Sequence, residues 1–341
     1  MSLETAKLLI DRAFEENPEY LSFCFQGGEP TIAGLPYFKQ FVEYVKKLSK
    51  PGQVVHYAIQ TNGILIDEQW AQFLKEHRFL VGLSIDGPQK YHDALRVDPD
   101  SKGTLRRVEC AWKLLQKYGV ETNILSVISA ATARHASQIY SYLKGLGANY
   151  LQFIACLDPL DEVRGGEGHS LTPERYGKFL CNLFDCWYTD FQKGQYVSIR
   201  QFDDWVHNLA GMPVSTCMST GRCGAYLVIE SDGSAYPCDF YVTDRHKLGM
   251  IQEESLSVLQ SNSENFIKES YHLPEMCKTC QYALACRGGC KRDRLFESGT
   301  AVGNYFCPAY LALFDYAWDR IQELAAYERK AYANLNTGRM L

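Results

Sequence analysis

Leu21-Ser-Phe-Cys-Phe25, followed directly by Gln26-Gly-Gly-Glu-Pro30, is the stretch that sets the pattern of the first half of this chain. A short apolar run that stops at glycine and proline is typical of a buried β-strand and the turn after it. Further strands are predicted at 53–60, 79–84, 120–127 and 149–154, and helices at 3–16, 35–48, 67–76, 104–118 and 133–145. Alternation of strand and helix predicts an α/β fold with a parallel sheet.

Three of the predicted strands end on glycine next to a polar residue: Gly27-Gly28-Glu29, Thr61-Asn62-Gly63 and Asp86-Gly87. The carboxyl ends of parallel strands meet at one edge of a sheet, where α/β proteins bind their ligands. Glycine lets the backbone approach a ligand closely, and Glu29 offers a carboxylate to an amino group. Each motif alone is also explained by a tight turn. Three together, in a chain that also carries a cysteine array, predict a cofactor pocket.

The array lies in the C-terminal part of the chain and consists of Cys217, Cys223, Cys238, Cys277, Cys280, Cys286, Cys290 and Cys307. Disulfides are typical of short secreted chains, whereas Met1 leads into a helical pattern and not into a signal peptide. Zinc suits the Cys277-x2-Cys280 pair, but the other spacings supply no second tight pair. A [4Fe–4S] cluster accepts thiolates at irregular spacing. The spacing therefore favours iron–sulfur clusters over zinc.

Composition narrows the class of protein further. A net charge of -5 and a pI near 5.9, with no basic run interleaved with aromatic residues, argue against a nucleic-acid surface. No apolar stretch reaches the roughly 18 residues that span a bilayer, so no membrane segment is expected. The 13 cysteines fit a reducing compartment, which predicts a cytoplasmic protein.

Four motifs together closely resemble the anaerobic sulfatase-maturating enzymes, to about residue 325: Gln26-Gly-Gly-Glu-Pro30, Gln60-Thr-Asn-Gly63, Leu83-Ser-Ile-Asp-Gly-Pro88 and the cysteine array. These enzymes are radical S-adenosylmethionine (SAM) proteins with a C-terminal SPASM domain. The resemblance implies a partial (β/α)6 TIM-like barrel that lacks its first strand, followed by a cysteine-rich SPASM domain. The expected segments are a truncated barrel at 1–160, a linker loop and helices at 161–210, the SPASM domain at 211–310, and a C-terminal helix and tail at 311–341.

The resemblance also implies a radical SAM oxidoreductase that oxidises a Cys or Ser of a sulfatase to Cα-formylglycine. The family pattern places the SAM methionine moiety against Gly27, Gly28, Glu29, Ser84, Arg96 and the backbone of Leu157. Asp239, directly after Cys238, matches the proposed general base, although the residue alone reads as a turn carboxylate.

Two auxiliary [4Fe–4S] clusters follow from the same resemblance. Cys217, Cys223, Cys238 and Cys290 are expected to bind one, and Cys277, Cys280, Cys286 and Cys307 the other. Reconstitution of this chain is therefore expected to load about eight irons.

One departure from the family is plain. The chain has no Cys-x3-Cys-x2-Cys triplet, which the family uses to bind a third, SAM-binding cluster after the first barrel strand. We expect the strand at 21–25 to lie at an open edge and the chain as given to be inactive. A start codon set inside a longer gene is the preferred explanation, ahead of a gene remnant or a truncated paralogue.

The implied partners are a sulfatase polypeptide with a Cys/Ser-x-Pro/Ala-x-Arg type of motif and an electron donor such as ferredoxin or flavodoxin. Two alternatives stay open at this point. One is a radical SAM/SPASM maturase of another ribosomal peptide, and the other is a non-catalytic iron–sulfur protein that binds peptides or transfers electrons.

A few further features complete the predictions. Cys24, Cys110 and Cys156 are expected in the core as small apolar residues. The segment 158–170, rich in glycine and charge, is expected to be a mobile surface loop. A hairpin with an Asp232-Gly233 turn is predicted at 226–236, and a long helix after Cys307.

Overall fold

The computed structural model describes residues 1–16, 18–160, 162–298 and 300–336. The chain divides into two compact units, each built from separate stretches of sequence. The first unit comprises residues 1–85, 89–125 and 225–265, and the second comprises 86–88, 126–224 and 266 onward.

A parallel sheet is the central element, as the sequence predicts. Its order is β1 (Tyr20–Phe25), β2 (Val54–Thr61), β3 (Phe79–Ser84), β4 (Thr122–Ile128), β5 (Tyr150–Ala155) and β6 (Ser198–Ile199). β1 pairs with β2, β2 with β3, β3 with β4, and β5 with β6, all in parallel register. Within the described residues β1 lies at the edge, as expected. β6 was not predicted, because two residues are too short for a periodic pattern.

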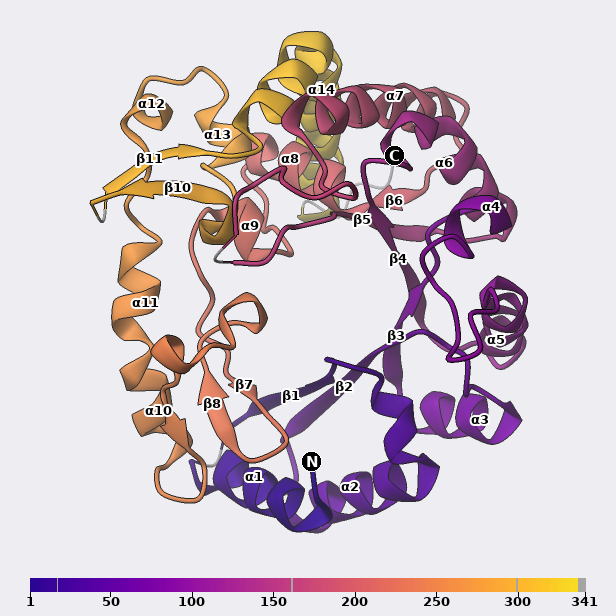
Figure 1. Ribbon diagram of the computed structural model, residues 1–341, viewed down its shortest axis with the longest axis vertical. Helices are drawn as coiled ribbons and strands as arrows, with labels where there is room; N and C mark the ends of the chain where they lie inside the picture. The colour runs from indigo at the N-terminus through magenta and orange to yellow at the C-terminus, as the bar shows by residue number, and fades with distance from the viewer. Residues whose placement is uncertain (17, 161, 299, 337–341) are drawn as a thin grey trace. The chain divides into compact units, whose positions relative to one another are not determined.

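Helices of the first unit follow the strands in alternation. They are α1 (Leu3–Glu15), α2 (Leu35–Leu48), α3 (Glu68–Glu76), the short α4 (Gln89–His92) and α5 (Leu105–Lys117), with a 3-10 turn η1 (Pro30–Ala33) after β1. Figure 1 shows α2, α3 and α5 along one side of β1, β2 and β3. The Ser2 and Asp67 side chains cap α1 and α3 by accepting hydrogen bonds from Thr5 and Trp70 amides.

Side-chain alternation along β1 decides which residues reach the helices. The Phe23 ring lies 5.2 Å from that of Phe41, and the Phe25 ring lies 4.9 Å from that of Phe38, both on α2. Cys24 points to the opposite face of the strand and is exposed. The prediction of a core cysteine is wrong there. It is also wrong for Cys110, which lies on the face of α5 away from its buried stripe and is exposed, whereas Cys156 is half-buried.

A small antiparallel sheet completes the first unit. Its strands are β7 (Val228–Ile229), β8 (Ser234–Tyr236) and β9 (Gly249–Met250), and it is followed by α10 (Leu256–Asn262). Ala235, Ile251 and Leu259 form a buried cluster on which Leu8 and Leu9 of α1 pack. The predicted hairpin is confirmed, with Gly233 at φ +91° in its turn.

Long helices form the core of the second unit. They are α6 (Ala136–Gly145), α7 (Pro173–Gln192), α8 (Arg200–Ala210) and α14 (Cys307–Asn336), with η2 (Ala133–His135) before α6. Figure 1 shows α7, α8 and α14 gathered together. Trp205 of α8 meets Phe314 of α14 at 5.3 Å between ring centroids. A Cβ at Gly177 of α7 would lie 3.2 Å from Ala312 Cβ, so small residues let α7 and α14 approach closely.

Short elements lie around the predicted ligand cysteines of the second unit. These are α9 (Cys217–Thr220), α11 (Glu264–Glu269), which starts in the first unit, α12 (Glu275–Lys278), α13 (Ala283–Cys286), η5 (Lys291–Asp293) and the hairpin of β10 (Arg294–Glu297) with β11 (Thr300–Asn304). Two further 3-10 turns, η3 (Asp239–Tyr241) and η4 (Asp244–His246), lie in the first unit. None of the described helices is both long enough and apolar enough to cross a membrane.

Hydrogen bonds hold the segment 158–170 in place more firmly than its composition suggests. The buried Asp158 carboxylate accepts hydrogen bonds from the Gly165 amide at 2.8 Å and from the Ser170 hydroxyl. Its backbone carbonyl accepts a hydrogen bond from the Arg292 guanidinium. The predicted loop is therefore tied at both ends to buried polar groups.

Candidate functional site

Glu29 ties the end of β1 to the end of β2. Its Oε1 accepts hydrogen bonds from the Thr31 amide at 3.0 Å, the Thr31 hydroxyl at 2.6 Å and the Thr61 hydroxyl at 2.7 Å. Its Oε2 accepts one from the Asn62 amide at 2.7 Å. Three donors occupy Oε1, whereas Oε2 keeps capacity for a further donor. The carboxylate therefore acts first as a tie between two of the predicted motifs.

Gly27 and Gly28 occupy backbone conformations that favour glycine. Their φ angles are +83° and +47°, and no other atom lies within 4 Å of the Cβ that a larger residue would add. The glycines are therefore required by backbone conformation and leave open space beside them. That space fits the predicted approach of a ligand to this turn.

Ser84 ends β3 and accepts a hydrogen bond from Gln60, which belongs to the Gln60-Thr-Asn-Gly63 motif but was not predicted as a site residue. Gln60 Nε2 donates a hydrogen bond to Ser84 Oγ at 3.1 Å. A Cβ at Gly82 would lie 2.0 Å from Gln60 Oε1, so the amide of Gln60 lies across the strand where Gly82 has no side chain. The only signal in the sequence was its place directly before Thr61-Asn62-Gly63.

Arg96 lies in the segment between α4 and α5, where its backbone is fixed. Its amide donates to the His92 carbonyl at 2.9 Å, and its carbonyl accepts from the Thr104 hydroxyl at 3.0 Å. Leu157 belongs to the second unit, where it follows β5 and is half-buried. The structure thus brings Glu29, its two glycines and Ser84 to strand ends of the first unit and puts Leu157 at a strand end of the second.

Asp239 forms a triangle with two neighbours in the first unit. The Tyr226 hydroxyl donates to Asp239 Oδ1 and lies 3.3 Å from it, and it also lies 3.3 Å from Cys238 Sγ. The Cys238 thiol in turn donates to Asp239 Oδ1 at 3.3 Å. Tyr226 is a second residue that the sequence analysis missed, because twelve residues separate it from Cys238.

The charge of Asp239 affects the pKa values of two thiols, those of Cys238 and Cys24. Burial raises the pKa of Cys238 to about 12; the Tyr226 hydrogen bond opposes this rise and the charge of Asp239 adds to it. Burial, and then the charge of Asp239, also raises the pKa of Cys24 on β1. Cys24 therefore lies within electrostatic reach of the predicted base. A thiol with a pKa this high keeps its proton at neutral pH, and a metal that bound the sulfur would displace that proton.

Four predicted ligands come together in the second unit. Burial raises the pKa of Cys286 to about 12, and the charges of Cys307, Cys277 and Cys280 raise it further. Burial and then Cys277 and Cys280 raise the pKa of Cys307, and burial and then Cys280 raise that of Cys277. These mutual effects mean that the four sulfurs converge on one region. Among the described residues no three His, Cys, Asp or Glu side chains lie as close as one metal ion requires, whereas a four-iron cluster spreads its thiolates over separate irons.

The other predicted set is divided between the two units. Cys217, Cys223 and Cys290 belong to the second unit and Cys238 to the first. The Cys223 amide donates to the Ser270 hydroxyl at 2.9 Å. Burial raises the pKa of the Cys223 thiol, while the Ser270 hydrogen bond and the charges of Lys291 and Arg294 oppose the rise.

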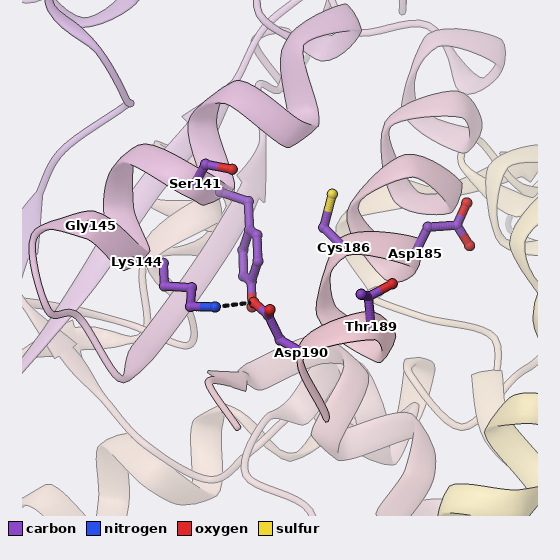
Figure 2. A pocket seen from close by; sticks show the side chains of 8 residues that line it. Ser141, Lys144, Gly145, Asp185, Cys186, Thr189 and Asp190 are labelled. Carbon is purple, nitrogen blue, oxygen red and sulfur yellow. Dashed lines mark hydrogen bonds and ion pairs between the residues drawn. The ribbon is translucent and has the colours of Figure 1, made fainter. Parts of the chain in front are cut away.

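A cavity of about 610 Å³ lies between α6 and α7 and contains none of the predicted site residues. Figure 2 shows Lys144 and Asp190 side by side within it, with Cys186 on the facing helix. Lys144 Nζ lies 2.7 Å from an Asp190 carboxylate oxygen, and the Tyr140 hydroxyl donates to that carboxylate at 2.8 Å. The charges of this cavity are thus already paired.

Two family profiles match the chain. The radical SAM superfamily matches residues 1–139, and the SPASM iron–sulfur cluster-binding domain matches residues 217–281. The second match covers Cys217, Cys223, Cys238, Cys277 and Cys280. The predicted types of the two domains, radical SAM and SPASM, are therefore confirmed.

Characterised relatives extend over nearly the whole chain. A cysteine-type anaerobic sulfatase-maturating enzyme of Clostridium perfringens is 44% identical over 325 residues, which cover 94% of this chain and 88% of that enzyme. A serine-type enzyme of Bacteroides thetaiotaomicron is 32% identical over 339 residues, which cover 93% of this chain and 80% of that enzyme.

A solved structure agrees with the fold. The structure described as native anSMEcpe with bound AdoMet and Kp18Cys peptide matches with a TM-score of 0.92 and 44% identity. The match covers 96% of this chain and 91% of the anSMEcpe chain. Identity at this level over almost the full length leaves one assignment. This chain belongs to the family of anaerobic sulfatase-maturating enzymes, within the radical SAM superfamily.

Proposed function

We propose that this protein oxidises a cysteine side chain of a sulfatase to Cα-formylglycine. The observation that carries the proposal is the identity of 44% with a cysteine-type enzyme, against 32% with a serine-type enzyme. The neighbouring structure with a bound cysteine peptide supports a peptide substrate. Serine is kept as the second target, since both types lie in the family.

Residues at the strand ends fit the expected cofactor, SAM. Gly27 and Gly28 have open space beside their backbone, and Oε2 of Glu29 can accept a hydrogen bond from an amino group. We propose that these three residues hold the methionine end, with Ser84, Arg96 and the backbone of Leu157 around the rest. When bound, SAM and its cluster supply the radical that takes a hydrogen atom from the substrate Cβ, and the auxiliary clusters take up the remaining electron.

Asp239 is proposed as the general base that accepts the thiol proton of the substrate. Loss of that proton, together with one hydrogen atom and one electron, converts the Cβ–SH group to a thioaldehyde, which water then hydrolyses to the aldehyde with release of hydrogen sulfide. Tyr226 donates to Oδ1 of Asp239, so Oδ2 is left to receive the proton. The hydrogen bond also fixes the orientation of the carboxylate.

The cysteines are proposed to bind two auxiliary [4Fe–4S] clusters. Convergence of Cys277, Cys280, Cys286 and Cys307 within the second unit supports one set. The other set, Cys217, Cys223, Cys238 and Cys290, rests on the family pattern. The catalytic cluster needs a Cys-x3-Cys-x2-Cys triplet, which these 341 residues do not contain. We therefore propose the activity for a polypeptide that includes one.

The remaining proposals concern partners and place. The substrate is a sulfatase segment of the Cys/Ser-x-Pro/Ala-x-Arg type, and a ferredoxin or flavodoxin supplies electrons. A chain with 13 cysteines suits a reducing cytoplasm, which we propose as its location.

The test begins with the DNA upstream of this chain, read in frame for the triplet. The polypeptide that includes it is purified without oxygen, loaded with iron and sulfide, and incubated with SAM, a reductant and a Cys-x-Pro-x-Arg peptide. Mass spectrometry should find the aldehyde on the cysteine, and a matched serine peptide should react more slowly. If both sulfatase peptides stay unmodified but SAM is consumed when a different ribosomal peptide is supplied, the protein is a different maturase. No SAM consumption at all would indicate a non-catalytic iron–sulfur protein.

A further inference from the structure

Four consecutive charged residues lie buried directly after Cys290. Lys291, Arg292, Asp293 and Arg294 are only 4–6% exposed. Buried charges are costly unless they are paired or hydrogen-bonded, so such a run needs specific partners. From the sequence alone, a run of four charged residues would be expected on the solvent-exposed surface.

Arg294 donates hydrogen bonds to several backbone carbonyls. Nε donates to the Gly288 carbonyl at 3.5 Å, and Nη1 donates to those of Ser270 at 2.5 Å and His272 at 3.4 Å. Nη2 donates to the carbonyls of Gly221 at 2.7 Å and Gly289 at 3.1 Å. A guanidinium has five N–H donors in a fixed fork. Five carbonyls match these five donors in number.

These carbonyls belong to the loops that carry the predicted ligands. Gly221 lies between Cys217 and Cys223, and Gly288 and Gly289 lie between Cys286 and Cys290. Ser270 and His272 precede Cys277 and Cys280. One buried side chain therefore connects three separate cysteine loops, all of them in the second unit.

The loops also pack directly on one another. A Cβ at Gly221 would lie 2.0 Å from the Arg287 carbonyl oxygen, and Gly221 has φ +69°. Asn304 Nδ2 donates to the Gly288 carbonyl at 3.1 Å, which supports the same turn from β11. Glycine at position 221 therefore lets the two cysteine loops approach backbone to backbone.

The charge of Arg294 acts on the ligands as well. Arg294 is 4% exposed, and its guanidinium donates to carbonyls between Cys217 and Cys223 and between Cys286 and Cys290, so its positive charge lies beside predicted ligands. A cation that favours a thiolate also favours extra negative charge on a cluster bound there. Reduction potentials of iron–sulfur clusters depend on nearby charge and on hydrogen bonding.

We propose that Arg294 is a positioning residue that holds the three cysteine loops in their ligand arrangement before metal binds, and that its buried charge raises the reduction potential of the auxiliary clusters. The proposal rests on the proposed function only in taking these cysteines as cluster ligands. Pre-formed loops lower the ordering cost of assembling a metal site.

Two variants separate the two parts of this role. Arg294→Lys keeps the charge but has three rotating donors in place of the five-donor fork, and Arg294→Gln also removes the charge. Arg320→Lys is the matched control, since Arg320 lies in the same unit and pairs with Asp185 at 2.7 Å without bonding to a cysteine loop.

Hydrogen exchange of the metal-free protein tests the scaffold. We expect both Arg294 variants to exchange about tenfold faster than wild type at residues 217–223 and 270–290, and the control to match wild type. Equal exchange in all four proteins overturns the scaffold role. A variant that is unfolded in both metal-free and loaded form overturns it too, because Arg294 would then be a general folding residue.

Redox titration of the loaded protein, followed by electron paramagnetic resonance, tests the charge. We expect the auxiliary potentials of Arg294→Lys to stay near wild type and those of Arg294→Gln to become more negative. Equal potentials in the two variants overturn the electrostatic role. Failure of the proposed function has a different signature: the loaded polypeptide that includes the Cys-x3-Cys-x2-Cys triplet would leave the peptide unmodified while these readouts behave as expected.

Discussion

The carboxylate of Glu29 accepts a hydrogen bond from the backbone amide of Asn62 at 2.7 Å, although 33 residues separate them in the chain. This bond joins the turn after β1 to the turn after β2. The shape of the proposed SAM site in the first unit therefore depends on one charged side chain that is already engaged by the protein.

Glu29→Gln is expected to weaken this site without unfolding the protein. The glutamine amide would present donors where the Asn62 amide or a threonine hydroxyl also donates, so at least one bond is lost. Hydrogen bonds to charged groups contribute about 1.5–3 kcal/mol, which predicts a loss of SAM affinity of at least tenfold by calorimetry. Glu43→Gln on the exposed face of α2 is the control and should bind SAM as wild type does.

Gly28→Ala tests the backbone at φ +47°. An L-residue in this region costs about 1–2 kcal/mol, and the added methyl group would enter space that we assign to the ligand. We expect a lower melting temperature and weaker SAM binding. Gly145→Ala is the matched control, since Gly145 lies in α6 with nothing within 4 Å of an added Cβ. It should instead stabilise the protein by about 0.5–1 kcal/mol, and equal effects of both changes would contradict the assignment.

Asp239→Asn and Tyr226→Phe are expected to differ in size of effect. In the polypeptide that includes the Cys-x3-Cys-x2-Cys triplet, removal of the base should lower kcat on the cysteine peptide by roughly 10²–10⁴-fold. Removal of the Tyr226 hydroxyl leaves the carboxylate in place and should cost about tenfold, the worth of one hydrogen bond to a charged group. Iron content, measured alongside, should be unchanged in both. A Tyr226→Phe enzyme as slow as Asp239→Asn would make the hydroxyl, and not the carboxylate, the essential group.

Cys280→Ser should remove one auxiliary cluster. The loaded chain is expected to fall from about eight irons to about four, because this cluster would lose one of the four thiolates that hold its irons. Cys186→Ser is the control: its thiol lies 3.3 Å from the Ser137 hydroxyl and belongs to neither ligand set. An unchanged iron count in Cys280→Ser would overturn this ligand assignment.

Asp190→Asn tests the ion pair in the cavity of Figure 2. Burial alone would raise the pKa of Asp190, but hydrogen bonds from Lys144 and Tyr140 and the Lys144 charge lower it overall. A lowered pKa stabilises the folded state above the unfolded pKa of the carboxyl, and this stability is lost as pH falls through the folded pKa. The variant should unfold more easily at pH 7 by about 1–2 kcal/mol, and the difference in melting temperature from wild type should shrink towards pH 3.

Much of the fold could be predicted because its signals are local. The five longer strands, and the helices predicted at 3–16, 35–48, 67–76, 104–118 and 133–145, lie within two or three residues of their observed bounds. Apolar periodicity and a glycine turn decide such elements within a few residues of sequence. The same holds for the Gly27-Gly28-Glu29 turn, whose conformation only glycine adopts easily. The strand β6 was not predicted, because two residues are too few to show a periodic pattern of apolar side chains.

Tertiary structure decided the contacts between distant segments. Arg294 donates to Gly221 across 73 residues, and nothing local distinguishes its buried run from a solvated one. Cys24 was expected in the core, yet strand alternation turns it away from α2, because Phe23 and Phe25 occupy that face. Spacing and family pattern alone thus determined which cysteines are candidate ligands. Only the fold decided which side chains hold those cysteines, since a hydrogen bond forms wherever the folded chain places a donor beside an acceptor.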